Sequence, residues 1–521
     1  MDKLKCVGVE FYGYNHVYGG AAGTSMKRIE MRAALFPSLK TLSFYDCPAL
    51  IEWKEVDVIT PTDEKAVVFP CLEGLTLWKC RELRNAPNRF PSLQKLFIHD
   101  SDHVMPIENI CSQLTTLTRL KIGKAKELSC LPVGMLEKNQ NLRSLLIGGC
   151  EKLSHLPDGL HTLCLLEILE IVDCPKLTCI SIHSLTSLRG LHIENCGGST
   201  NLQMVDKEFS LDDLTSYECN GLKSILISGL QSCTSLHWVH IINCQYLRHL
   251  PVYGLQTLVS LEELYIKDCT NLEAIPSLDN LTSLAELYIE DCTNLEAIPS
   301  LDHLTSLREL FIRGCDGLTS LPRGIQSCTS LKKFTISKCH SLISLADVDV
   351  SRLQSLSNLE IFDCRKLKYL PTGLHSLSLE RMKIGMFWEE LDSFPDFELP
   401  SQIRWLKISG WPKLKSLPQQ IQHLTTCLQS LFVRSFDSME AFPEWLGDLT
   451  SLISLRVKEC KNLMYLPTVE VMERLTKLSE LDIDGCPHLV ERCAKESGPE
   501  WHKIWHIPDI IEGFYSNRKN K

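Results

Sequence analysis

The stretch ELYIKDCTNLEAIPSLDNLTSL at residues 263–284 recurs almost unchanged as ELYIEDCTNLEAIPSLDHLTSL at residues 286–307. These tandem copies indicate the duplication of one repeat, and the pattern LxxLxLxxCxxLxxLP describes most of the chain. At the centre of the repeat, leucines alternate with polar residues, and this period of two is typical of a short strand that buries one face. Each repeat is therefore predicted to contain one strand followed by a turn.

The first leucine of the repeat can be followed along the chain, with isoleucine at one position, at 39, 72, 93, 117, 142, 166, 188, 214, 236, 261, 284, 307, 331, 356, 379, 403, 428, 452 and 478. After the first interval the spacing is 21 to 26 residues, as in leucine-rich repeats. Leu4, Val7 and Val9 suggest one further repeat, and the repeat at 214 is the weakest match.

A single repeat buries too little apolar surface to offset the entropy lost when its backbone is ordered, so neighbouring repeats must stack on one another. We therefore expect an α/β fold, a leucine-rich-repeat solenoid. This is a curved horseshoe with a parallel β-sheet on its concave face and an irregular or short helical convex side.

Cysteine occupies one fixed position of the repeat. Thirteen of the 24 cysteines stand eight residues after the first leucine, at 47, 80, 150, 174, 196, 244, 269, 292, 315, 339, 364, 460 and 486. A small apolar side chain with a weak S–H donor suits a place where the chain turns inward. We expect these cysteines to be structural, reduced thiols.

The ends of the chain differ from its middle. We expect residues 1–35 to form a partial first repeat plus an insertion loop, 36–485 the solenoid of about 19 repeats, and 486–521 a C-terminal cap and basic tail. The segments 13–34 and 54–68 are too long for a repeat and are either tolerated insertions or a binding loop. Solenoids need capped ends, and the apolar residues predicted to cover the last leucine layer are Trp501, Ile504, Trp505 and Ile507.

Composition and motifs exclude several classes of function. The formal net charge of −10 disfavours nucleic acid as a partner. No apolar stretch approaches the ~18–20 residues of a membrane span, and the first residues do not resemble a secretory signal. The HExxH, GxSxG and GxxxxGK[ST] motifs do not occur in the sequence. We therefore expect a cytoplasmic, non-enzymatic chain with no catalytic, cofactor-binding or metal-binding residues of its own.

Positions two, four and six after each first leucine are predicted to lie on the concave surface, where a partner could bind. One zone is acidic and aromatic and contains Trp238, Glu263, Tyr265, Glu286, Tyr288, Glu309, Phe311 and Arg313. A basic strip with two aromatic residues contains Arg381, Lys383, Trp405, Lys407, Phe432, Arg434, Arg456 and Lys458. Aromatic residues and arginine dominate binding energies, and segregated charge orients a partner. The alternative is that these positions are an ordinary polar strand face.

The end of the chain resembles a known family. The ending C-P-x-L-x-x-R-C-x(4)-G-x-x-W-x-K-I-x-H-I-P-x-I is carried by Cys486, Pro487, Leu489, Arg492, Cys493, Gly498, Trp501, Lys503, Ile504, His506, Ile507, Pro508 and Ile510. With the repeat pattern, it resembles the leucine-rich region of plant nucleotide-binding, leucine-rich-repeat disease resistance proteins of the coiled-coil class. The segments KLKCVGVEFYGYN and FPSLKTLSFYDCPALIEW (3–15 and 36–53) resemble a mid-region of the same receptors.

The resemblance implies an innate-immunity receptor region. Such a region recognises a pathogen effector or a modified, guarded host protein, and it regulates a nucleotide-binding switch module in cis or in trans. ADP or ATP would bind only in such an upstream module, because this chain lacks the phosphate-binding loop. The basic strip is the candidate for the intramolecular contact and the acidic, aromatic zone for the ligand. The alternatives are a stand-alone adaptor or decoy, or the substrate receptor of a ubiquitin ligase.

Overall fold

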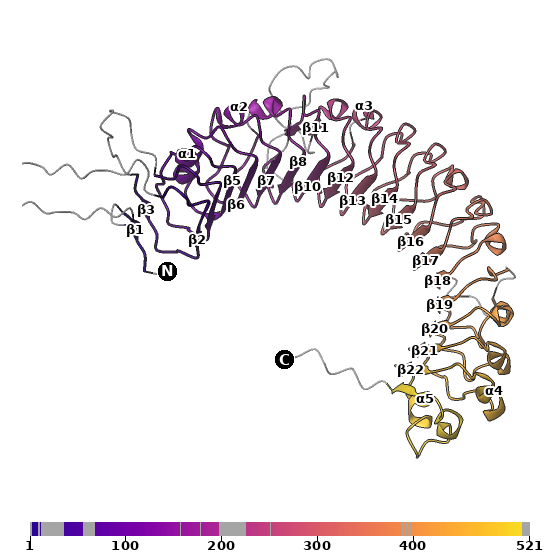
Figure 1. Ribbon diagram of the computed structural model, residues 1–521. Coiled ribbons are helices and arrows are strands. Elements are labelled where there is room, and N and C mark those ends of the chain that lie inside the picture. Colours follow the sequence, from indigo (N-terminus) through magenta and orange to yellow (C-terminus); the bar gives the residue numbers. More distant parts are fainter. Residues whose placement is uncertain are drawn as a thin grey trace, which may run out of the picture. The chain divides into compact units, whose positions relative to one another are not determined.

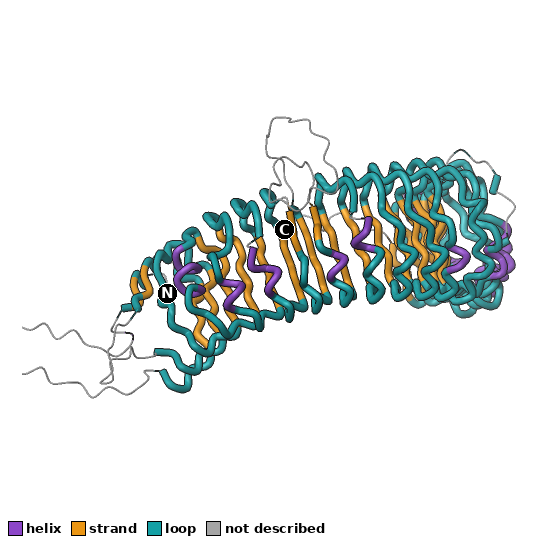
Figure 2. Tube along the Cα trace, turned by 90° about the horizontal axis from the view of Figure 1, so that it is seen from above, coloured by secondary structure: helices purple, strands orange, loops and turns teal. Residues whose placement is uncertain are grey.

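The computed structural model describes residues 3–8, 11, 36–55, 68–156, 158–177, 179–196, 226–250, 252–387, 390, 393–394 and 398–512. The chain forms two compact units, Met1–Leu272 and Glu273–Lys521, called here the N-terminal and the C-terminal unit. Each unit is a stack of repeats in which strands line one side, and short helices and turns line the other (Figures 1 and 2). The fold is a leucine-rich-repeat solenoid, as the repeat pattern predicts.

In the N-terminal unit one parallel ladder runs through β2 (Thr41–Tyr45), β4 (Gly74–Trp78), β5 (Lys95–Ser101), β6 (Arg119–Ala125), β7 (Ser144–Gly148), β8 (Ile168–Val172), β10 (Gly190–Glu194), β12 (Trp238–Ile242) and β13 (Glu263–Lys267). The opposite side carries α1 (Met105–Cys111), α2 (Met135–Lys138), α3 (Val252–Leu255) and 3-10 turns. Short second strands also pair, β1 (Cys6–Val7) with β3 (Glu52–Trp53) and β9 (Cys179–Ser181) with β11 (Leu226–Ser228).

The ladder of the C-terminal unit contains β14 (Glu286–Glu290), β15 (Glu309–Arg313), β16 (Lys333–Ser337), β17 (Asn358–Phe362), β18 (Arg381–Gly385), β19 (Trp405–Ser409), β20 (Ser430–Arg434), β21 (Ser454–Lys458), β22 (Glu480–Asp484) and β23 (Asp509–Glu512). Its other side is built mainly from 3-10 turns, with α4 (Val469–Arg474) and α5 (Pro487–Arg492) near the end. In both units the predicted register is confirmed, because the strands begin two residues after the first leucine of the repeat.

The residue between each strand and its cysteine has a left-handed backbone. Asp268 (φ 52°), Gly314 (φ 66°) and Lys338 (φ 53°) are examples. Glycine, asparagine and aspartate adopt this conformation more readily than other residues, which explains why they often precede the cysteine. The turn directs the following side chain inward beneath the strand.

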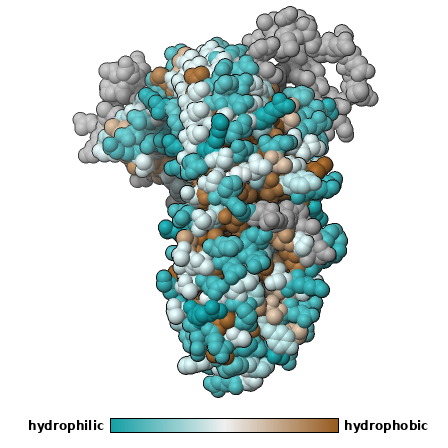
Figure 3. Space-filling model, turned by 90° about the vertical axis from the view of Figure 1, so that its right-hand side faces the viewer, coloured by the Kyte–Doolittle hydropathy of each residue, from teal (hydrophilic) through white to brown (hydrophobic). Residues whose placement is uncertain are grey.

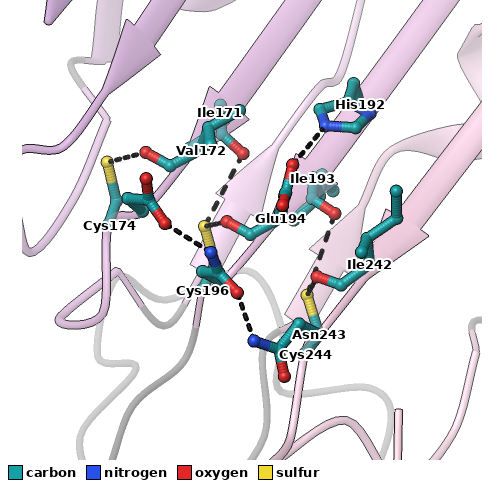
Figure 4. A network of polar contacts seen from close by, with 12 residues as sticks. Ile171, Val172, Cys174, His192, Ile193, Glu194, Cys196, Ile242, Asn243 and Cys244 are labelled. Atoms are coloured by element: carbon teal, nitrogen blue, oxygen red, sulfur yellow. Dashed lines mark hydrogen bonds and ion pairs between the residues drawn. The ribbon is translucent and has the colours of Figure 1, made fainter. Parts of the chain in front are cut away.

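All thirteen cysteines at this position are buried, free thiols. In each case Sγ donates to the carbonyl oxygen of the last strand residue, at 3.2 to 3.7 Å. Figure 4 shows three of them, Cys174, Cys196 and Cys244, one above the other beside the strand ends. Burial raises the pKa of Cys80 and of Cys196 to about 12. The predicted structural role of these cysteines is confirmed.

Three successive repeats of the C-terminal unit replace the cysteine with an aromatic residue. Phe387, Trp411 and Phe436 stand at this position and are fully buried. The ring of Trp411 lies 6.0 Å from that of Phe387 and 5.8 Å from that of Phe436. Its Nε1–H donates to the carbonyl oxygen of Phe387 at 2.7 Å, so the indole joins two repeats by packing and by a hydrogen bond.

Two repeat assignments need correction. Cys6–Val7 pairs with Glu52–Trp53, which follows the cysteine of its repeat, so Leu4 and Val7 belong to the later part of a repeat rather than to its first strand. Strand β10 pairs directly with β12, which leaves no place between them for a strand of the predicted 214 repeat. That stretch, like Val9 and the predicted loop 13–34, lies outside the described residues, and so does most of the loop 54–68.

Of the four residues predicted to cover the last leucine layer, two are buried. Ile504 and Ile507 are buried, whereas Trp501 is half-buried and Trp505 is 68% exposed, so the prediction was wrong for Trp505. The reason is local: Glu500 is buried and accepts hydrogen bonds from the backbone N–H of Leu466 (2.9 Å) and from Lys503 (2.8 Å). These contacts fix the turn so that Ile504 faces inward.

Candidate functional site

The side chains on one face of each strand remain accessible, and we call this the open face. The second and fourth residues of the strands are buried, while the first, third and fifth are mostly half-buried or exposed. All sixteen predicted binding residues lie on the open face, as the period of two requires. Their role in binding stays a prediction.

In the N-terminal unit the predicted zone is an aromatic cluster with its own polar contact. Trp238 lies over the neighbouring strand, where a Cβ added to Gly190 would come within 2.0 Å of the indole. Nε2 of His240 lies 3.0 Å from Oε1 of Glu263, and the imidazole is 5.0 Å from the ring of Trp238 and 5.6 Å from that of Tyr265. Packing between strands therefore fixes these side chains.

In the C-terminal unit the acidic residues are tied to a tyrosine. The hydroxyl of Tyr288 donates to Glu286 at 2.9 Å and to Glu309 at 2.8 Å, and Lys333 pairs with Glu309. Burial raises the pKa of Tyr288, and the hydrogen bonds to the two carboxylates raise it further. Burial alone would raise the pKa of Glu309, but the bonds from Lys333 and Tyr288 outweigh it and lower the pKa. Both carboxylates are thus engaged within the sheet.

Most cations of the predicted basic strip are neutralised by carboxylates. Arg434 donates two hydrogen bonds to Glu459, at 2.7 and 2.8 Å, and Arg456 bonds Glu480 at 2.7 Å. Lys458 lies 3.3 Å from Asp482. Lys383 pairs with Glu360, and the sequence analysis did not include either Glu360 or Glu459. The strip is thus less positive than its sequence indicates.

Two cations of the strip have aromatic neighbours and no carboxylate partner in the described part of the chain. The guanidinium of Arg381 lies 4.6 Å from the ring of Trp405. Nζ of Lys407 lies 4.4 Å from the ring of Phe432 and 5.6 Å from that of Phe362. Burial lowers the pKa of Lys407, and nearby cations lower it further.

Lys383 belongs to the same group, because its Nζ lies 4.1 Å from the ring of Phe362. We call the whole group the cation–π cluster. It comprises Phe362, Arg381, Lys383, Trp405, Lys407 and Phe432. The sequence analysis missed Phe362. Its place six residues after the first leucine of its repeat, on the same face as the others, was the available signal.

The described residues contain neither a membrane-spanning helix nor a metal cluster. Figure 3 shows one side of the molecule as mostly hydrophilic, with apolar residues in scattered places. Within the described ranges, no helix is long and apolar enough to cross a membrane. The same ranges contain no group of three or more His, Cys, Asp or Glu side chains placed to hold a metal ion.

Comparison with known proteins identifies the type of repeat. Residues 116–270 match the family model "Plant disease resistance protein RPS2-like, leucine-rich repeats". The chain is 44% identical over 54 residues to "Putative disease resistance protein RGA4" of Solanum bulbocastanum, which covers 10% of this chain and 5% of that protein. It is 28% identical over 167 residues to "Disease resistance protein RPP5" of Arabidopsis thaliana, which covers 32% of this chain and 11% of that protein. These matches therefore span only a small part of either relative.

Among solved structures, a leucine-rich-repeat protein of Leptospira interrogans superposes with a TM-score of 0.42 at 17% identity, covering 81% of this chain and 90% of that chain. The family match and the curated relatives agree with the resemblance of the C-terminal ending. The repeats within residues 116–270 match the leucine-rich repeats of plant disease resistance proteins, and parts of the chain are similar to members of that group.

Proposed function

We propose that this chain is the recognition and regulatory region of a plant innate-immunity receptor. Its open face binds protein partners: a pathogen effector or a modified host protein, and a nucleotide-binding switch module in cis or in trans. The region itself is non-enzymatic and acts in the cytoplasm. Any ADP or ATP is bound by the switch module.

The cation–π cluster is the observation that carries this proposal. Interface hot spots are enriched in tryptophan and arginine, clustered and partly desolvated. Trp405 and Arg381 are of these residue types and lie together, and Lys407 is half-buried on the neighbouring open-face position of the same strand. Because these two cations are not neutralised by carboxylates among the described residues, a partner with carboxylates or aromatic rings gains new interactions there without first breaking an ion pair.

The test is a signalling assay with the receptor that contains this region together with its switch module. The variant Trp405→Ala/Lys407→Glu removes the aromatic platform and reverses one charge. We expect it either to lose the response to the recognised protein or to signal without it, as leaf cell death scored after transient expression. Its matched control is Tyr369→Ala/Lys415→Glu, which removes an aromatic ring and reverses one charge at exposed positions outside the named strands.

The two variants separate binding from folding. Both should accumulate to wild-type levels, and only Trp405→Ala/Lys407→Glu should change signalling. Wild-type signalling by this variant would refute a role for the cluster. The same loss in the control would show that the assay reports a general defect.

A further inference from the structure

The open face of the first strands of the N-terminal unit carries cations and no carboxylates, a pattern that β18–β21 of the C-terminal unit share. On β2, β4, β5, β6 and β7 no open-face position carries Asp or Glu, although the whole chain has a net charge of −10. Acidic open-face residues begin at β8, with Glu170. These five strands therefore form a distinct, carboxylate-free stretch of the ladder.

Cations cluster on this stretch. Three cations stand on the open face: Lys95 on β5, and Arg119 and Lys121 on β6. Two more lie just after an open-face position: Lys79 directly follows β4, and Lys124 directly follows the fifth residue of β6. Among the described residues none of the five has a carboxylate within ion-pair distance. Two of the nearby acids are engaged elsewhere: Arg81 donates to Asp100 at 2.7 and 3.0 Å, and Lys126 lies 2.8 Å from Asp102. The five cations are thus not paired with these carboxylates.

An aromatic stack lies in the middle of these cations. Trp78 of β4 is nearly parallel to two rings of β5, with centroids 4.1 Å from His99 and 5.8 Å from Phe97 and interplanar angles of 9° and 10°. Nζ of Lys121 lies 5.0 Å above the Phe97 ring. His99 in turn covers Gly123, where an added Cβ would come within 2.6 Å of the imidazole. The stack is therefore held by residues of three neighbouring strands.

Stacked rings turn their faces toward one another and their edges outward. The edge of an aromatic ring carries positive potential, so it favours carboxylate oxygens. Burial lowers the pKa of His99, and Lys124, Lys121 and Lys79 are close enough to lower it further. The cations and the ring edges thus present the same sign of potential.

We propose that the open face of β4–β6, with Trp78, Phe97, His99, Lys95, Arg119 and Lys121, is a docking surface for an acidic peptide segment of a partner protein. Charge complementarity is the basis of this assignment. Three strands spaced ~4.8 Å apart extend over roughly 10 Å, which suits an extended core segment of about three residues. This site is separate from the cation–π cluster and does not depend on the function proposed for it.

A nucleic acid fits this surface less well. Platforms for single strands offer free ring faces on which bases stack, whereas here Phe97 and His99 stack against Trp78. A long polyanion that continued along the ladder would also meet Glu170 and Glu194 on the next strands. A shallow depression of about 490 Å³ adjoins the strand starts and is lined by Ser92, Gln94, Thr116, Thr118 and Arg143. Its hydroxyl and amide groups suit the polar backbone of a peptide.

The experiment measures fluorescence anisotropy of a labelled peptide of alternating Glu and Gly, about ten residues long, titrated with the full chain. The comparison probes are the same peptide with Gln in place of Glu and an oligo(dT) of equal charge. The test variant is Lys121→Glu/Lys124→Glu. The matched control is Lys176→Glu/Lys415→Glu, which changes the net charge equally at exposed lysines elsewhere.

We expect the wild-type chain to bind the Glu peptide and not the Gln peptide, with affinity falling as salt rises. The test variant should bind at least about tenfold more weakly, and the control should stay within about twofold of wild type. Equal weakening of both variants would overturn the site, because only net charge would then matter. Wild-type affinity in the test variant would also overturn it. Binding of oligo(dT) as tight as that of the Glu peptide would assign the surface to nucleic acid instead.

Discussion

Replacing Trp411 with cysteine separates two explanations of the fold. The sequence pattern alone predicts that Trp411→Cys is tolerated, because cysteine occupies this position in thirteen other repeats. The structure predicts the opposite. The side chain is fully buried, and its ring lies 4.9 to 6.0 Å from the rings of Phe387, Phe394 and Phe436. The space around it has the size of an indole and not of a thiol.

The expected cost follows from the lost packing and the lost hydrogen bond. Truncation of a buried tryptophan to alanine costs about 3–5 kcal/mol, part of it from the cavity that remains. Cysteine keeps one heavy atom more than alanine, which lowers this cost. However, the carbonyl oxygen of Phe387 also loses its donor, at about 1 kcal/mol. We expect a net loss of about 3–4 kcal/mol.

Because repeat stacks open locally, the loss is best measured by hydrogen exchange of individual strands. Amides of β18, β19 and β20 should exchange at least about a hundredfold faster in Trp411→Cys, while those of β14 and β15 should be unchanged. The control is Cys339→Ala, a buried ladder position with a small side chain, where at most about a tenfold change is expected. If Trp411→Cys exchanged like this control, the aromatic residues would not be required for packing, and the reasoning would be refuted.

Three further predictions concern the buried thiols, a glycine and the cap. Between pH 9 and 12 the chain should lose stability, because Cys196 and Cys233, whose pKa is raised from 9.0 to about 12 by burial, stay protonated in the fold while unfolded thiols ionise. The unfolded state then binds fewer protons, so the free energy of unfolding falls by at most about 1.4 kcal/mol for each thiol and each pH unit. A urea midpoint that stays constant over this range would contradict the prediction. Gly385→Ala should lower the thermal midpoint, at a cost in folding free energy of about 2 kcal/mol or more. The reason is that φ of Gly385 is 136° and the new Cβ would lie 2.0 Å from the carbonyl oxygen of Ser409. An unchanged melting curve by circular dichroism would count against this. Glu500→Gln should weaken the cap by about 2–3 kcal/mol, because it weakens the hydrogen bonds that Glu500 accepts from Leu466 and Lys503. The effect should appear as faster hydrogen exchange in β23. Wild-type exchange there would show that the buried charge is not needed.

The register of the strands could be predicted because it depends on burial within a single repeat. Alternating leucines have only one inward face, so the first leucine fixes where a strand such as β14 begins. The choice between two apolar residues of the cap was different. Ile504 and Trp505 are adjacent in sequence, and only the contacts of Glu500 with other parts of the chain decide which one faces the core.

The false repeat at 214 arose for a related reason. The sequence LTSYECNGL satisfies the local pattern. However, which strands pair with each other depends on all the strands of the ladder. Strand β10 pairs directly with β12, over the five positions from Gly190–Trp238 to Glu194–Ile242. A single sequence shows which segments can form a strand, and it does not show which of them enter the ladder.

The same distinction applies to the candidate site, and it decides which substitution tests binding. The face of each residue was predictable, whereas the ion pairs were not, because they join residues about one repeat apart, such as Arg434 and Glu459. Reversing the charge of Arg434 would place two carboxylates side by side and disturb β20 and β21 whether or not a partner binds there. Lys407 has no carboxylate to release within the described residues, so its reversal breaks no ion pair, although it removes the contacts with Phe362 and Phe432. A loss of recognition in Lys407→Glu at wild-type protein level therefore reports on binding more directly than the same loss in Arg434→Glu.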